Sequence, residues 1–104
     1  MNNKNNKEIT KKYEGKLLGI VDYDRNQRHY VEDFIDKKKL LKFLFGLYDY
    51  ETTFTKSGFK FLEEYYGIDE VVKMMEEDEP GFSKGDRCTP KEYLYMKAQY
   101  AVGE

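Results

Sequence analysis

The residues that stand out most for their type and spacing are carboxylates in the third quarter of the chain. Between residues 63 and 79 the sequence holds eight acidic side chains and a single base, Lys73. Such a density of one charge bears on which partners a protein attracts. We interpret the segment as a surface that presents acid and tyrosine to a basic protein partner, formed by Glu63, Glu64, Tyr65, Tyr66, Asp69, Glu70, Glu76, Glu77, Asp78 and Glu79. The alternative is a solvated side of two short helices.

A second set of oxygen-bearing side chains has the spacing of a calcium-binding loop. Asp22, Asp24, Asn26 and Asp33 match its first, third, fifth and twelfth positions. The sixth position is Gln27, where the sharp turn of such a loop requires glycine, and the twelfth lacks the usual glutamate. A hairpin turn with local side-chain hydrogen bonds explains the pattern better. We therefore predict no metal ion and no other cofactor, and cation binding by this turn stays open.

The sequence offers little for catalysis. His29 is its only histidine, and no serine or cysteine lies near it along the chain. Cys88 is its only cysteine and precedes the expected start of the last helix. We find no phosphate-binding glycine loop, dinucleotide fingerprint, paired-cysteine motif or metalloprotease motif. We therefore expect no catalytic residues and predict that the protein is not an enzyme.

Positive charge is concentrated in the first half of the chain. Residues 1–52 hold eleven bases and nine acids, whereas residues 53–104 hold seven bases and eleven acids. The lysines between residues 4 and 16 and between residues 37 and 42 could contact phosphates. The acidic pI of about 5.5 and the presence of only three arginines argue against this. A small nucleic-acid-binding accessory protein is therefore the alternative function.

Composition indicates one folded domain. The 104 residues include seventeen Phe and Tyr side chains, enough to form a core despite the high charged fraction. No run of residues is long and apolar enough to cross a membrane, and the polar start is not a secretory signal. A single cysteine fits a reducing compartment, so we expect a cytoplasmic protein. The excess of lysine over arginine, fifteen to three, suggests an AT-rich genome such as that of a bacterium or phage.

The elements that must position these residues can be read from the apolar spacing. Residues 16–23 and 28–31 read as the two strands of a hairpin. A helix is expected from Asp33 or Asp36, and residues 47–54 read either as the end of this helix or as a short strand. Two short helices follow: one starts near Thr55 or Ser57 and stops at Gly67, and the next has Asp69 as its N-cap.

The last helix has the clearest local signal. Thr89-Pro90-Lys91-Glu92 has the residues of a capping box with proline in the first turn. Because the helix that follows is apolar nearly all round, we expect Tyr93, Met96 and Tyr100 to line the core with Leu18, Ile20, Leu41 and Phe45. The same character makes a homodimer through this helix possible.

Together these patterns predict a flexible basic tail over residues 1–12 and a single α+β domain over residues 13–104. In this domain an N-terminal β-hairpin or small antiparallel sheet packs against three to four short α-helices. The function that we predict is a non-enzymatic protein-binding module, an inhibitor or adaptor of phage or mobile-element type. Its acidic, tyrosine-containing face would mimic nucleic acid toward a basic partner that normally binds it. The sequence leaves the partner's identity, the oligomeric state and the source organism open.

Overall fold

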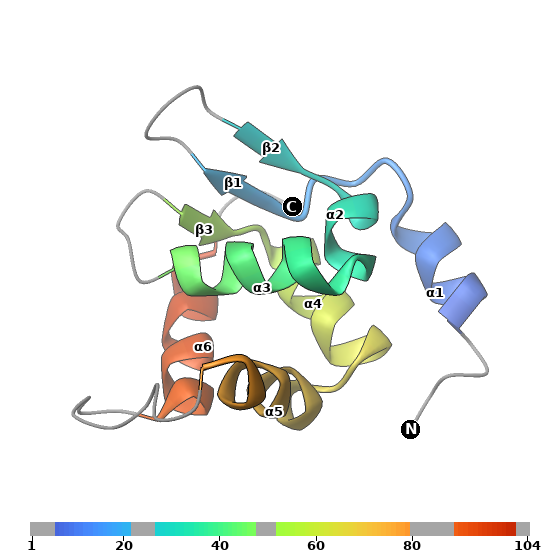
Figure 1. Cartoon of the computed structure of the whole chain (residues 1–104). Coiled ribbons are helices and arrows are strands. Elements are labelled where there is room, and N and C mark those ends of the chain that lie inside the picture. Colours follow the sequence, from blue (N-terminus) through green and yellow to red (C-terminus); the bar gives the residue numbers. More distant parts are fainter. Residues whose placement is uncertain (1–5, 22–26, 48–51, 80–88, 102–104) are drawn as a thin grey trace.

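The part of the chain that the computed structural model describes, residues 6–21, 27–47, 52–79 and 89–101, forms a three-stranded sheet and six helices (Figure 1). The elements follow in the order α1 (Asn6–Tyr13), β1 (Gly19–Val21), β2 (Gln27–His29), α2 (Val31–Ile35), α3 (Lys37–Gly46), β3 (Thr52–Phe54), α4 (Lys56–Tyr65), α5 (Ile68–Asp78) and α6 (Pro90–Gln99). The α+β class is confirmed, with more helices than the three to four expected.

The sheet is antiparallel and has the strand order β2-β1-β3. In the predicted hairpin, Gly19 pairs with His29 and Val21 pairs with Gln27. On the other side of β1, Gly19 pairs with Phe54, so the strand interpretation of residues 47–54 is correct for residues 52–54. The predicted turn over residues 22–26, with Asp22, Asp24 and Asn26 of the calcium-like spacing, lies outside the described residues.

Helix α4 is attached to the sheet through Thr55. The Thr55 hydroxyl donates to Leu17 O (2.6 Å), and its backbone N–H donates to Leu18 O (3.1 Å). The same hydroxyl oxygen accepts from the Gly58 N–H (3.0 Å) and so caps the first turn of α4. A Cβ atom at Gly58 would overlap Leu18 O, so only glycine lets the helix approach the strand this closely.

The region expected as one helix from Asp33 or Asp36 is divided into α2 and α3. Asp36 has an extended backbone, with φ −85° and ψ 113°, and its carboxylate accepts from the N–H groups of Lys38 and Lys39. Asp36 is therefore the N-cap of α3, which agrees with the later of the two predicted starts. Asp33 lies inside α2, the short preceding helix.

A single core lies between the sheet and the helices. Phe34, Phe43, Phe54 and Phe61 form a chain of ring contacts through it, with neighbouring ring centroids 5.1–6.2 Å apart. Helix α6 contributes Leu94, which is fully buried, and the Tyr93 hydroxyl donates to Leu47 O (2.9 Å).

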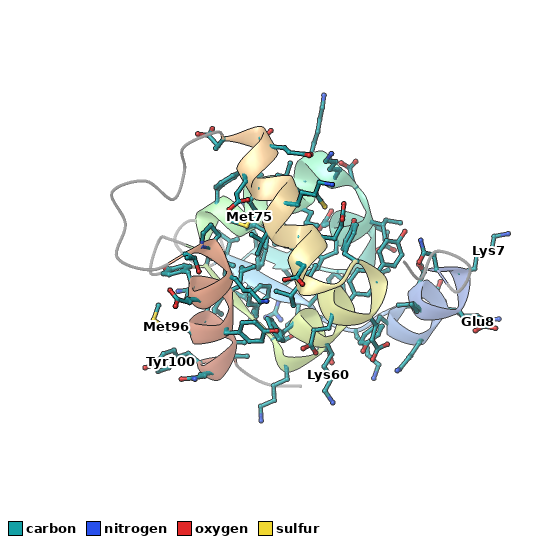
Figure 2. All side chains as sticks on the ribbon, turned by 90° about the horizontal axis from the view of Figure 1, so that it is seen from below. Lys7, Glu8, Lys60, Met75, Met96 and Tyr100 are labelled. Atoms are coloured by element: carbon teal, nitrogen blue, oxygen red, sulfur yellow. The ribbon has the colours of Figure 1, made fainter. Side chains whose placement is uncertain are left out.

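Two side chains that were expected in the core, Met96 of α6 and its C-cap Tyr100, are at the surface. Met96 is 41% and Tyr100 70% exposed, and Figure 2 shows both at the outer edge of α6. The prediction was wrong because an all-round apolar helix does not reveal which side faces inward, and Leu94 sets that side. Among the other expected core residues, Leu18 and Leu41 are buried, whereas Ile20 and Phe45 are half-buried.

The N-terminal segment differs from the expected tail. Residues 1–5 lie outside the described part, but Asn6–Tyr13 form helix α1, which packs on α4. Tyr13 is 3% exposed, and its ring meets the Phe61 ring edge-on at 5.4 Å. The tail interpretation overlooked that one tyrosine at the end of a polar helix can attach it to the core.

Replacing Gly58 by alanine is predicted to destabilise the protein by about 1–3 kcal/mol, because the added methyl group overlaps Leu18 O. An exposed helical Gly→Ala change ordinarily stabilises by roughly 0.5–1 kcal/mol, so even the sign of the effect is diagnostic. Urea unfolding of G58A measures it, with K60A on the exposed side of α4 as a control that stays within about 0.5 kcal/mol of the wild type. A neutral or stabilising G58A would show that α4 can move away from β1.

Candidate functional site

The predicted acidic segment is divided between two helices. Glu63, Glu64 and Tyr65 end α4, Tyr66 is its C-cap, and the acids from residue 69 onward belong to α5 or its end. Gly67 joins the helices with a φ of 86°, which glycine adopts far more readily than other residues. The predicted stop at Gly67 is correct. The N-cap of α5 is Gly67 itself rather than Asp69, which lies in the first turn of α5.

Glu64 is paired with helix α1. Its carboxylate accepts from Lys12 Nζ (3.1 Å) and from the Tyr13 hydroxyl (3.1 Å). Burial of the phenol, reinforced by this hydrogen bond to Glu64 and by the nearby negative charge, raises the pKa of Tyr13 to about 12. Glu64 therefore serves to attach α1 to α4, and its charge is not free for a partner.

Asp69 is also paired within the chain. Lys91 at the start of α6 approaches its Oδ1 atom to 2.9 Å, and this hydrogen bond raises the pKa of Lys91. Both side chains are more than half exposed, so the pair adds little to stability. It does cancel one negative charge at the start of α5.

The two tyrosines are built into the fold. Tyr66 donates its hydroxyl to Phe34 O (2.7 Å), and burial raises its pKa to about 12. The Tyr65 ring stacks on Phe61 with a centroid distance of 4.9 Å and meets the Tyr66 ring edge-on at 4.7 Å. Both residues are half-buried, and these contacts hold their rings in fixed positions.

The acids that remain belong mainly to one side of α5. We call this side the outer face of α5: it consists of Glu70, Lys73, Glu76 and Glu77 and continues into Asp78 and Glu79. All six side chains are exposed, and no ion pair joins any of them to another residue that the structure describes. Val71, Met74 and Met75 point inward from the opposite side, and Figure 2 shows Met75 in the interior.

Glu63 does not belong to this face. Helical spacing places it on the exposed side of α4 that also carries Lys56 and Lys60. Its surroundings are therefore of mixed charge. The structure brings together the acids from Glu70 to Glu79 and separates them from Glu63 and Glu64.

A surface groove adjoins the outer face at the junction of α4 and α5. Its volume is about 710 Å³, and we call it the corner groove; it is lined by Asn6, Ile35, Lys37, Tyr65, Tyr66, Gly67, Ile68, Asp69, Glu70 and Met74. Four of the predicted partner-binding residues, both tyrosines and the first two acids of α5, thus share one concave surface. Ile35 and Asn6 could not be assigned to this groove from the sequence, because they belong to α2 and α1, which are distant along the chain.

The corner groove has one unsatisfied polar atom. Asn6 Oδ1 is buried, and no residue in the described ranges donates a hydrogen bond to it. Leaving a buried acceptor unsatisfied costs about 1–3 kcal/mol. Because this oxygen is buried, it is not exposed to a partner in this structure.

A second, smaller cavity of about 410 Å³ lies between the sheet and α3 and contains His29. The His29 Nδ1 atom lies 3.0 Å from Asp33 Oδ2, so the histidine has a carboxylate partner that the sequence analysis did not assign to it. The spacing of four residues was visible in the sequence, but it spans the end of β2 and the start of α2. Only the fold shows that it becomes a contact.

Two further observations concern metals and membranes. Within residues 6–21, 27–47, 52–79 and 89–101, no three His, Cys, Asp or Glu side chains are grouped so as to hold a metal ion. In those same ranges, no helix has the length and apolar character needed to span a membrane.

Comparisons with protein families, with curated proteins and with solved structures find no match to this chain.

The raised pKa of Tyr66 predicts a pH dependence of stability. The folded chain keeps this phenol protonated up to about pH 12, whereas the unfolded chain loses the proton near pH 10. The stabilisation is therefore complete below pH 10 and is lost as the pH rises from 10 to 12. The pKa of Tyr13 is also raised to about 12, so this tyrosine contributes a loss of stability over the same pH range.

Urea unfolding at pH 9, 10 and 11 should show a smaller alkaline loss of stability in Y66F than in the wild type. At pH 7 the variant should be less stable by about 1 kcal/mol, because Phe34 O loses its donor. Y100F is the control, since Tyr100 is 70% exposed. Parallel pH profiles for Y66F and the wild type would contradict the role of Tyr66.

Proposed function

We propose that this protein is a non-enzymatic binding module that engages a basic partner protein through the corner groove and the outer face of α5. The observation that carries the proposal is the continuity of these two surfaces. Asp69 and Glu70 line the groove, and Glu70 also begins the outer face. A partner could thus place an apolar side chain in the groove and basic side chains along the helix.

The charge of the outer face supports a cationic partner. Five carboxylates and one lysine are exposed there within ten residues, and none has an ion-pair partner among the described residues. At a rise of about 1.5 Å per residue, Glu70 and Glu77 are roughly 10 Å apart along the helix axis. Charges spread in this way steer an oppositely charged protein and increase its association rate.

The position of these acids on α5 gives a second argument. Glu76, Glu77 and Asp78 occupy the last turn, where the helix dipole is negative, and the last turn contains no basic residue. Each acid there destabilises the isolated helix, typically by about 0.3–1 kcal/mol. Local conflict of this kind is expected where a sequence is constrained by function, and a basic partner would remove it.

The corner groove adds ordered apolar and aromatic contacts, which a charged surface alone does not offer. Ile35 is 40% exposed at its edge, and Tyr65 and Tyr66 are held by ring contacts and by the bond to Phe34 O. Side chains that are already ordered lose little entropy when they bind.

The more specific version of the proposal is an inhibitor or adaptor of phage or mobile-element type, acting in the cytoplasm. In this version the carboxylates of α5 take the place of phosphates in a groove that otherwise binds nucleic acid. The support for it is the density of free acids on one helix; the identity of the partner is left to experiment.

Charge reversal on α5 tests the proposal. Proteins captured from a lysate by the wild type are purified, and their affinity is measured by calorimetry against the wild type and the E76K/E77K variant. We expect the variant to bind at least about tenfold more weakly, with a flatter dependence on salt. Two lysines at the C-terminal end of α5 interact favourably with the helix dipole, so the variant should be at least as stable as the wild type. A loss of binding would therefore not reflect unfolding.

The matched control is E8K/E32K, which changes the net charge equally at two exposed acids on α1 and α2. This control should retain the wild-type affinity. Equal affinity of E76K/E77K and the wild type, or equal weakening by both double variants, would contradict a binding role for the outer face.

The rival function, nucleic-acid binding, has one structural observation in its favour. Lys37, Lys38, Lys39 and Lys42 are all exposed on α3. Filter binding of a labelled oligonucleotide over a salt series separates the two proposals. Phosphate contacts by these lysines predict a steep fall in affinity with salt, and an acidic binding module predicts no binding at any salt concentration.

A further inference from the structure

The cavity between the sheet and α3 has the dimensions and lining of a small-molecule site that is separate from the corner groove. Its volume of about 410 Å³ falls within the range of such sites, roughly 300–1,000 Å³. Residues of β1, β2, β3, α2 and α3 contribute to its lining. The cavity therefore lies where the sheet meets α2 and α3.

The apolar side of the cavity is fixed by Phe43. This ring is 4% exposed and packs against Phe34 and Phe54 with centroid distances of 5.1 and 5.7 Å. A Cβ atom at Gly19 would overlap the Phe43 ring, so β1 lies directly against it. The floor of the cavity is thus part of the core and is formed before any ligand arrives.

Among the described residues that line the polar side, Asp33 is the one carboxylate, and it is already engaged. Asp33 Oδ2 lies 3.0 Å from His29 Nδ1, and Asp33 Oδ1 lies 3.8 Å from Lys39 Nζ. The contact with Asp33 uses Nδ1 of His29, so Nε2 is the ring nitrogen left for a ligand. The His29 ring also lies against Phe43, with a centroid distance of 5.5 Å.

Lys42 is the charged group of the lining that lacks such a partner. Lys39 and Lys42 lie one turn apart on α3 and both line the cavity, but no carboxylate among the described residues pairs with Lys42. The described lining residues thus include two lysines and one carboxylate, an excess of positive charge. Gln27 adds an amide donor. These groups would attract an anion rather than a cation.

We propose that this cavity binds a small organic anion, with its charged group at Lys42 and its apolar body on Phe43. His29 and Gln27 also line the cavity, and Nε2 of His29 and the amide of Gln27 would hydrogen-bond to the polar part. A phosphate or a carboxylate satisfies the same groups, so the ligand class is an anionic group on a planar or apolar body. This site is independent of the protein-binding surface on α5.

The probe is phenyl phosphate, titrated into the full chain and followed through the amide NMR signals of Gln27, Phe43 and Gly46. Removing the charge in K42Q should weaken its binding at least about tenfold, because a charge-assisted hydrogen bond is lost. Lys42 is exposed, so the variant should fold, and a thermal melt verifies this. The control K38Q removes an exposed lysine of the same helix that does not line the cavity, and it should bind like the wild type.

Three further titrations define the ligand. Phenol lacks the charge and inorganic phosphate lacks the apolar body, so both should bind more weakly than phenyl phosphate. Benzoate distinguishes a carboxylate from a phosphate. Binding of either aromatic anion that is tighter than the binding of phenol and of inorganic phosphate supports the proposal. Equal weakening in K42Q and K38Q, inorganic phosphate binding as tightly as phenyl phosphate, or no shift of the three amide signals would overturn it.

Discussion

The junction between β3 and α4 at Thr55 determines where the rest of the molecule lies, because the sheet and the helices share hydrogen bonds there. Thr55 donates to two successive carbonyls of the segment leading into β1, and its hydroxyl also caps α4. Three bonds at one buried residue fix the direction in which α4 leaves the sheet. Helix α4 extends about 15 Å over its ten residues, so the junction at Thr55 also sets the position of Gly67 and of α5.

Local signals in the sequence were enough to predict the elements whose ends depend on nearby residues. The capping box at Thr89, with its reciprocal bonds to Glu92 of 3.0 and 3.2 Å, and the stop at Gly67 are formed as expected. Features that depend on distant residues could not be predicted in this way. Helix α1 is held by Phe61 and Glu64, about fifty residues further along the chain. Likewise, the side of α6 that faces inward depends on its packing against distant core residues, through Leu94.

The acidic segment shows the same limit at the level of function. Its acids were predicted to act together, but the turn at Gly67 directs two helices differently. Two of the acids are neutralised by Lys12 and Lys91, which come from opposite ends of the described chain. The spacing within α5 predicts which of its acids share one side. No pattern within the segment could show that Tyr66 would bond to Phe34 O or that α2 would complete a groove beside it.

The pairing of Glu64 with α1 has a consequence for how the corner between α4 and α5 responds to binding. A partner that takes hold of Glu64 must displace both Lys12 and the Tyr13 hydroxyl, which are two of the contacts that keep α1 in place. Thermodynamic linkage then joins such binding to detachment of the first helix. Faster amide hydrogen exchange in α1 on complex formation would mark that competition, and unchanged exchange would mark a partner that leaves Glu64 alone.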